Sequence, residues 1–238
     1  KEQAMLEVRD LVKTFDGVHA VDGLSFDVPD DAVLGMIGVN GSGKTTTLNC
    51  ICGLTAPSSG SIRFDDREIA GLPAHEIMHL GLGRTFQVPQ VFNRMTLTDN
   101  LLVPVFESAK ADSTLQDAAE ACLEAVNLAH LRHNFAEELS GGQQKLLELA
   151  RLMMFQPGLV LLDEPFAGVN PSLCMEMMGH IERMRAMGTS FILVSHDLTS
   201  IYRLSTDIVV LNAGRIIAHG DAGHVKSHPD VIEAYLGI

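Results

Sequence analysis

The sequence predicts a mixed α/β fold with a mostly parallel sheet and a helical segment inserted in its middle. Strand-like runs alternate with helical runs in the first and last thirds of the chain, and a glycine-rich loop joins one strand directly to one helix. Between these parts, apolar residues such as Leu115, Ala119 and Val126 recur at helical spacing. Strands that alternate with helices indicate a parallel sheet covered on both faces.

Four short strands and one helix are expected in the first third. A turn at Pro29-Asp30-Asp31 separates the second strand from the third, and Gly53 stops the helix. The strands are expected at residues 5–9, 24–28, 32–37 and 61–64, and the helix at residues 44–52.

The middle of the chain is expected to be a helical insertion that Pro157 ends. Strand and helix patterns then alternate again, with strands at residues 158–163, 191–194, 208–211 and 215–219, a helix at 171–187 and a short helix after Pro229. We therefore expect two parts. Residues 1–87 and 157–238 form a nucleotide-binding core, and residues 88–156 form a helical subdomain.

Composition narrows the classes of partner. The chain has 238 residues and a net charge of −13, which argues against a nucleic-acid partner because phosphate contacts need a clustered basic surface. No apolar stretch approaches the ~20 residues that cross a bilayer, and no basic and apolar leader opens the sequence, so we expect a cytoplasmic location. The four cysteines show no C-x-x-C spacing and are expected to be buried apolar residues.

A phosphate-binding loop is predicted between a strand and a helix. Gly38-Val39-Asn40-Gly41-Ser42-Gly43-Lys44-Thr45 fits the pattern G-x-x-x-x-G-K-[ST]. Its glycines allow the backbone to wrap phosphate groups with positive φ angles. We expect Lys44 to neutralise phosphate oxygens, Thr45 to offer its hydroxyl to Mg²⁺, and the helix N-terminus, including Thr46, to face the anion.

Two adjacent acids, Asp163 and Glu164, follow the apolar run Val160-Leu161-Leu162. A strand of this kind delivers its carboxylates to the carboxyl edge of the sheet, beside the phosphate loop. We expect Asp163 to hold Mg²⁺ through its shell and Glu164 to polarise the attacking water as general base.

A second anion site is predicted at Leu139-Ser140-Gly141-Gly142-Gln143, which precedes a helical run. The free N–H groups of a helix N-terminus bind anions, although Ser140 alone would also serve as an ordinary helix cap. Two phosphate sites about 100 residues apart are explained if two copies of the chain associate head to tail.

This combination of motifs resembles the ABC ATPases, in which L-S-G-G-Q is the hallmark that separates them from kinases and GTPases. The resemblance covers nearly the whole chain. It implies a P-loop NTPase (RecA-like) core with an antiparallel β-subdomain and an inserted α-helical subdomain carrying the signature. It also implies ATP hydrolysis with Mg²⁺ in a dimer, where one subunit covers the ATP of the other with Ser140, Gly141, Gly142 and Gln143.

Four further positions match functional residues of that family. Gln87 matches a glutamine that touches Mg²⁺ and water, His196 matches a switch histidine that contacts the γ-phosphate, and Phe15 matches an aromatic residue that stacks on adenine. Residues 165–170 match the loop through which the two subunits sense each other. Asn170 stands in that loop where many relatives carry aspartate.

Several segments of the sequence look most like those of the ATP subunits of branched-chain amino acid importers. They are Arg84-Thr85-Phe86-Gln87 and residues 93–102, 140–151 and 231–237. This resemblance implies a second ABC ATPase subunit, membrane permease subunits and a substrate-binding protein as partners, at the cytoplasmic face of a membrane. ATPases of lipopolysaccharide exporters and soluble ABC ATPases that transport nothing are the alternatives. The single cassette without a long coiled-coil insertion favours a transporter.

A competing motif lies on a predicted helix. His75-Glu76-Ile77-Met78-His79 satisfies H-E-x-x-H, the spacing by which two histidines bind zinc beside a catalytic glutamate. The expected helix is short, follows a proline, and is not succeeded by an evident third ligand. We therefore expect a surface helix rather than a zinc hydrolase.

Overall fold

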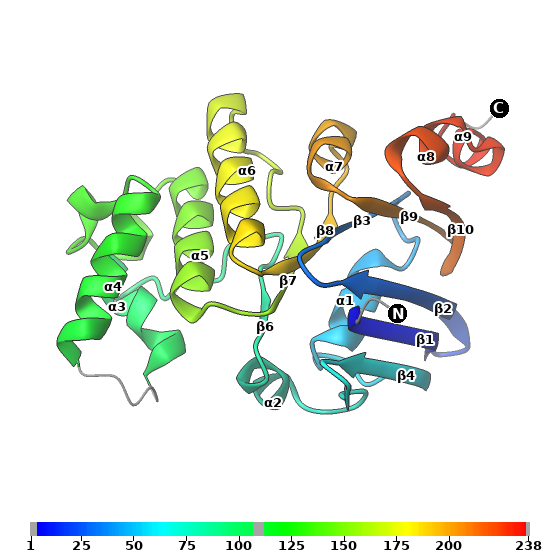
Figure 1. Ribbon diagram of the computed structural model, residues 1–238, viewed down its shortest axis with the longest axis horizontal. Coiled ribbons are helices and arrows are strands. Elements are labelled where there is room, and N and C mark those ends of the chain that lie inside the picture. The colour runs from blue at the N-terminus through cyan, green and yellow to red at the C-terminus, as the bar shows by residue number, and fades with distance from the viewer. Residues whose placement is uncertain (1–3, 107–111, 237–238) are drawn as a thin grey trace.

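The computed structural model describes residues 4–106 and 112–236. Gly237, the last residue of the segment 231–237, lies outside the described residues. The described chain contains a four-stranded antiparallel sheet and a six-stranded sheet, with a group of helices at the left of Figure 1. None of the helices in the described ranges is both long and apolar enough to cross a membrane.

The six-stranded sheet forms the centre of the molecule. Its strand order is β10-β9-β3-β8-β7-β6; the five strands from β9 to β6 run parallel to one another, and β10 pairs antiparallel with β9. These strands are β3 (Val33–Gly38), β6 (Leu82–Arg84), β7 (Leu159–Asp163), β8 (Ser190–Val194), β9 (Asp207–Asn212) and β10 (Arg215–Gly220). The carboxyl ends of β3, β8, β7 and β6 therefore meet at one edge.

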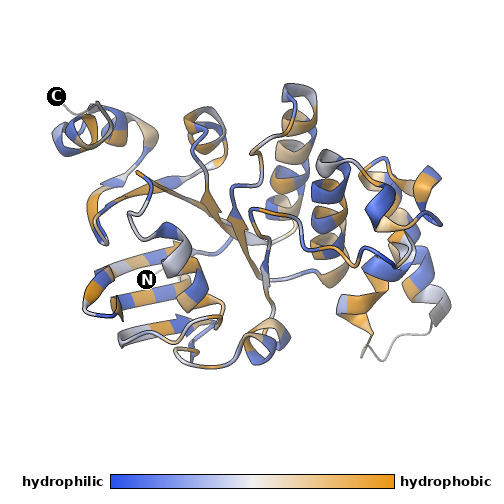
Figure 2. Cartoon of the chain, turned by 180° about the vertical axis from the view of Figure 1, so that it is seen from behind, coloured by the Kyte–Doolittle hydropathy of each residue, from blue (hydrophilic) through white to orange (hydrophobic). Residues whose placement is uncertain are grey.

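Both faces of this sheet are buried, so its strands are nearly continuous apolar runs (Figure 2). Side chains alternate between two cores: Val160 and Leu162 enter one, and Leu161 enters the other. The first core lies under α6 (Pro171–Ala186) and α7 (Leu198–Leu204), and the second holds α1 (Lys44–Ile51) and the antiparallel sheet.

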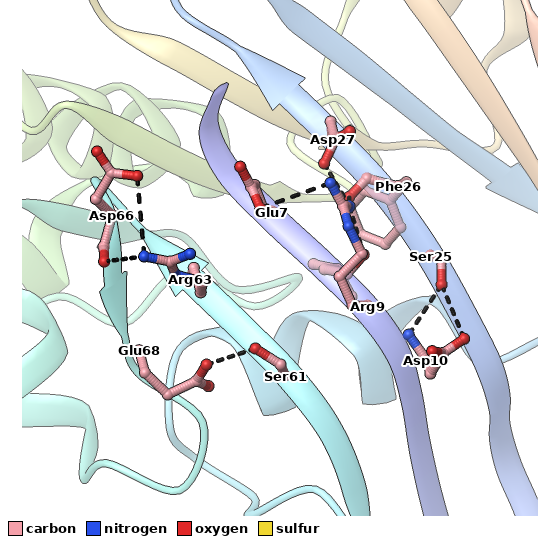
Figure 3. A network of polar contacts seen from close by, with 11 residues as sticks. Glu7, Arg9, Asp10, Ser25, Phe26, Asp27, Ser61, Arg63, Asp66 and Glu68 are labelled. Carbon is pink, nitrogen blue, oxygen red and sulfur yellow. Dashed lines mark hydrogen bonds and ion pairs between the residues drawn. The ribbon is translucent and has the colours of Figure 1, made fainter. Parts of the chain in front are cut away.

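The antiparallel sheet has the order β2-β1-β4-β5, formed by β1 (Ala4–Phe15), β2 (Val18–Pro29), β4 (Ser59–Phe64) and β5 (Arg67–Glu68). The first two strands are longer than predicted. Register shifts interrupt their alternation, and Asp10 lies in one of them with a φ of 47°, which hides the period-two pattern from the sequence. Polar contacts occupy this sheet, for example Arg9 with Asp27 at 2.5 Å (Figure 3).

The helices between residues 97 and 155 pack together beside the sheet edge. They are α3 (Leu97–Leu102), α4 (Asp112–Ala125), α5 (Gly141–Phe155) and the short 3₁₀ turns η1 (Val103–Val105), η2 (Ala129–Leu131) and η3 (Ala136–Glu138). Leu101, Leu123 and Leu147 are fully buried where these helices meet. The core of this part is continuous with the core above the large sheet.

The remaining helices connect and finish the fold. The short helix α2 (Ala74–His79) precedes β6, and α8 (Ala222–Ser227) and α9 (Pro229–Leu236) pack against β10 at the C-terminal end. Gly53 follows the end of α1 with a φ of 72°, in agreement with the predicted stop.

Candidate nucleotide site

The loop between β3 and α1 has the backbone that phosphate binding requires. Gly38, Gly41 and Gly43 have φ angles of 155°, 79° and 105°. A Cβ on Gly38 would lie 2.2 Å from the carbonyl oxygen of Leu211, and one on Gly43 would lie 2.5 Å from that of Ala20. Only glycine fits at these two positions, so the loop can present its N–H groups without a side chain in the way.

Lys44 is the first residue of α1 and is only 7% exposed. Its Nζ donates hydrogen bonds to the carbonyl oxygens of Gly38 (2.7 Å) and Val39 (3.0 Å). Burial lowers the pKa of Lys44, and the carboxylates of Glu164 and Asp163 act in the opposite direction. The ammonium group is therefore held inside the loop, near the two acids that the sequence singles out.

Glu164 follows the end of β7 in a left-handed conformation, with a φ of 50°. Its N–H donates to the carbonyl of Val194 at 2.9 Å, which ties it to the end of β8. Glu164 Oε2 accepts a hydrogen bond from the backbone N–H of His196 (3.1 Å), and the other carboxylate oxygen lies 3.3 Å from His196 Nε2. Backbone strain of this kind is typical of functional sites.

One oxygen of the Glu164 carboxylate is available for chemistry. Glu164 is only 8% exposed, and among the described residues its Oε1 has no hydrogen-bond partner apart from the charge contact with His196. A buried carboxylate oxygen without a partner can accept a proton from a water molecule held at that point.

The predicted residues of the core, apart from Gly38, meet in one cleft of about 550 Å³. Strand order explains this meeting, since the residues follow the adjacent carboxyl ends of β3, β8, β7 and β6. Phe15 reaches the cleft from the end of β1 and is 48% exposed. The predicted residues that line the cleft are Phe15, Asn40, Gly41, Ser42, Gly43, Lys44, Thr45, Thr46, Gln87, Asp163, Glu164 and His196.

The donor atoms of the cleft suit Mg²⁺. Thr45, Gln87 and Asp163 all line it, and they offer a hydroxyl, an amide oxygen and a carboxylate. Hard oxygen ligands of this kind bind Mg²⁺, which usually takes few protein ligands and completes its shell with phosphate and water.

Sequence reasoning did not assign a role to Arg84, which contacts one of the two acids directly. Its Nη2 lies 3.2 Å from Asp163 Oδ2, and both side chains are more than 90% buried. Its Nη1 donates to Asn49 Oδ1 at 2.6 Å, so the guanidinium joins Asp163 to α1. The only signal in the sequence was its place three residues before Gln87.

The signature residues do not line the cleft. Ser140 is the N-cap of α5, and its Oγ accepts the N–H of Gln143 while Gln143 Oε1 accepts the N–H of Ser140 at 2.9 Å. This reciprocal cap fixes the start of a 15-residue helix whose N-terminus includes Gly141 and Gly142. Within one chain, the structure thus separates the predicted second anion site from the phosphate loop.

Asn170 has a local role that the sequence did not predict. It is the N-cap of α6, and its Oδ1 accepts the N–H of Leu173 at 3.0 Å. An amide performs this capping as well as a carboxylate does. Capping of α6 therefore explains why position 170 carries a side chain with an oxygen acceptor, and either asparagine or aspartate would serve.

The H-E-x-x-H motif has no support as a zinc site. His75, Glu76 and His79 are exposed on α2, which is only six residues long. Among residues 4–106 and 112–236, no three potential ligands come together there. The expectation of an ordinary surface helix is in agreement with this placement.

Two family models match the sequence. One, described as ABC transporter, matches residues 21–167, and the other, described as branched-chain amino acid ATP-binding cassette transporter, matches residues 215–238. The first includes the phosphate loop, the signature and the acid pair. The second includes residues 231–237, one of the segments whose sequence resembles the branched-chain amino acid importers.

Curated relatives match over almost their full length. The probable branched-chain amino acid transport ATP-binding protein LivG of Archaeoglobus fulgidus is 38% identical, over 98% of this chain and 95% of its own. The high-affinity branched-chain amino acid transport ATP-binding protein BraF of Pseudomonas aeruginosa is 38% identical, over 98% of this chain and 98% of its own.

Solved structures share the fold. A nucleotide-free ATP-binding cassette from an ABC transporter superposes with a TM-score of 0.88 at 33% identity, over 99% of this chain and 100% of the other. A structure of the ADP conformation of an ATP-binding cassette of an ABC transporter, MJ1267, gives a TM-score of 0.88 at 34% identity with the same coverage. The predicted fold, with its β-subdomain and helical subdomain, is thereby confirmed.

Proposed function

The chain belongs to the family of ABC transporter ATP-binding proteins, and on that premise we propose that it powers the import of branched-chain amino acids. As a member of the family, it binds ATP and hydrolyses it to drive transport. The amino-acid substrate is supported by the names of its relatives and by the C-terminal match at residues 215–238.

The observation that carries the mechanism is the contact between Glu164 and His196 beside the phosphate loop. ATP lies with its phosphates on the loop, where Lys44 and the N-terminus of α1 stabilise their negative charge. Phe15, exposed at the rim of the cleft, stacks on the adenine. Thr45 and Gln87 would hold Mg²⁺, with Asp163 acting through the shell of the ion, and Mg²⁺ would supply positive charge to the phosphate oxygens.

Hydrolysis requires a water molecule in line with the terminal phosphoryl group. Glu164 orients that water and accepts its proton at the carboxylate oxygen that lacks a hydrogen-bond partner within the described residues. His196 is 54% exposed at its side chain, so its ring can contact the γ-phosphate while its backbone N–H holds Glu164.

A second ATPase subunit completes the site. Ser140, Gly141, Gly142 and Gln143 of one subunit cover the ATP bound to the phosphate loop of the other. The separation of these residues from the cleft within a single chain supports this arrangement. The loop at residues 165–170 lies between the acid pair and α6, where it can sense the neighbouring site.

Membrane permease subunits dock beside α2 and α5. An apolar groove of about 280 Å³ lies there, lined by residues that include Met78, Phe86, Pro104 and Phe155. Exposed apolar side chains continue the surface, with Phe106 86% exposed. A groove of this kind fits the apolar face of a partner helix. The chain then lies at the cytoplasmic face of the membrane, and a substrate-binding protein delivers the amino acid from the other side.

The test is Glu164→Gln, with Glu233→Gln on exposed α9 as the matched control. The first variant removes the general base and should lower ATP turnover by roughly 100-fold or more, while ATP binding is retained. Uptake of radiolabelled leucine by cells that depend on this chain should fall with turnover, and the control should match the wild type in both assays.

Two outcomes would contradict the proposal. Unchanged turnover in Glu164→Gln would remove this residue from the mechanism. Leucine uptake that persists after turnover is lost would show that the chain drives the transport of a different solute.

A further inference from the structure

Lys145 is a buried lysine that the mechanism above does not use. It lies on α5, five residues after Ser140, and is only 8% exposed. Its Nζ donates to the carbonyl oxygens of Glu164 (3.2 Å), Pro165 (3.0 Å) and Ala167 (2.7 Å). An ammonium group has three N–H donors, so this one is fully satisfied by backbone oxygens of a single loop.

The burial of Lys145 has an electrostatic cost that the loop offsets. Lysine is almost never fully buried unless it is paired, and burial lowers the pKa of this group, whereas the charges of Glu148 and Glu164 act in the opposite direction. The three carbonyl dipoles converge on one point and need a positive charge there. Without it, the carbonyl oxygens of Pro165 and Ala167 would lose the hydrogen bond that Lys145 donates, and the loss of a hydrogen bond to a buried acceptor destabilises the fold.

The loop that Lys145 holds begins with the strained residue of the site. Glu164 has its left-handed φ of 50°, and its carbonyl accepts both the lysine and the N–H of Ala167 (3.2 Å). A non-glycine residue keeps such a conformation only when its surroundings enforce it. From the strand side, the N–H of Glu164 is bound to Val194, and from the helix side its carbonyl is bound to Lys145.

We propose that Lys145 is a positioning residue for ATP hydrolysis, which fixes the backbone of Glu164 and thereby directs its carboxylate toward the attacking water. The inference rests on the proposed role of Glu164 as general base. Because α5 begins at the signature, the same contact joins the Ser140 end of the helix to the catalytic loop of its own chain. The helix rises about 1.5 Å per residue, so the two ends of this connection lie about two turns apart at most.

The experiment is a graded series at this position, Lys145→Met, Lys145→Gln and Lys145→Arg, each assayed for kcat and KM for ATP. Methionine keeps the length without a donor, glutamine keeps two donors, and arginine keeps the charge. We expect kcat to fall about 10- to 100-fold in Lys145→Met, less in Lys145→Gln and least in Lys145→Arg, with KM unchanged. Lys226→Met removes a charge from exposed α8 and should leave kcat unchanged.

A second arm separates positioning from general structural damage. Lys145→Met is combined with Glu164→Gln, and residual turnover is measured in single-turnover assays. If Lys145 acts through Glu164, the added substitution should change the residual rate by less than about twofold, because residues that act as a unit are not additive.

A flat kcat across the series, or an equal fall in both backgrounds, would overturn the inference. The glutamine and arginine variants retain hydrogen-bond donors, so they keep the test valid if the methionine variant does not fold. Glu164→Gln alone tests the proposed function separately. If that variant loses turnover while Lys145→Met keeps it, only the positioning role fails.

Discussion

Gly38, at the end of β3, and Glu164, after the end of β7, hold backbone conformations that most residues avoid. Gly38 ends β3 and has no room for a side chain, whereas Glu164 adopts its strained φ with a full side chain. The first permits the backbone to approach an anion, and the second directs a carboxylate into the cleft. Backbone strain lowers the stability of the fold at these two residues, and such strain is typical of sites whose geometry is fixed before the ligand binds.

Gly38→Ala and Gly41→Ala should therefore differ strongly. A Cβ at Gly38 meets Leu211 and Ser42, whereas one at Gly41 meets nothing within 4 Å, although both positions have positive φ. We expect Gly38→Ala to lower the free energy of unfolding by about 1 to 3 kcal/mol more than Gly41→Ala, because it adds overpacking to the backbone strain. Chemical denaturation measures the difference, and equal losses would contradict the geometry.

The motif residues were predictable because their chemistry demands given residue types at fixed spacing. Arg84 and Lys145 were not, since their partners are distant in sequence: Asp163 lies 79 residues from Arg84. Two short elements were not predicted from the sequence because they contain too few residues. The strand β6 has three residues and α7 has seven, too few to show a period, although Asp197 caps α7 and was a possible signal.

At the scale of elements, side chains of α5 form hydrogen bonds with two loops. Lys145 holds the loop after β7, and Glu148 and Arg151, each three residues further along, hold the segment after Gln87. Glu148 Oε1 accepts the N–H of Gln90 at 2.7 Å, and Arg151 Nη1 donates to the carbonyl of the same residue at 2.7 Å. Motion of this helix would thus move both loops that border the cleft.

Stability should depend on pH through Glu148. Burial raises its pKa from 4.5 to about 7, against the opposing effects of the Gln90 hydrogen bond, Arg151 and Lys145. Between these two values the folded chain keeps a proton that the unfolded chain has released, so stability falls as pH rises through that window. Below pH 4.5 both states hold the proton, and above pH 7 neither does.

Glu148→Gln removes this titration while it keeps an oxygen acceptor for Gln90. We expect the free energy of unfolding of the variant, relative to the wild type, to increase by about 1 to 3 kcal/mol from pH 4.5 to pH 7 and to stay constant above it. Denaturant titrations at several pH values measure this, with Glu233→Gln as the control. A difference that does not change with pH would show that folding does not raise the pKa of Glu148.

For the whole molecule, the decisive feature is the distribution of the site over two parts of the chain. The large sheet brings Phe15, Lys44, Glu164 and His196 into one cleft, while Ser140 lies at the start of α5 and does not line it. Each chain therefore holds one complete phosphate loop and one complete signature. Two copies related head to tail would pair these halves, so ATP would act as the link between subunits.

Sedimentation of Glu164→Gln with and without Mg-ATP tests this claim most directly, because the variant retains ATP and should accumulate in the closed state. The account predicts a monomer without nucleotide and a dimer with it. It also predicts that adding Ser140→Arg, which places a bulky side chain at the signature, keeps the protein monomeric although it still binds ATP. An ATP-dependent dimer that forms equally well with Ser140→Arg, or no dimer in Glu164→Gln at saturating Mg-ATP, would contradict the account.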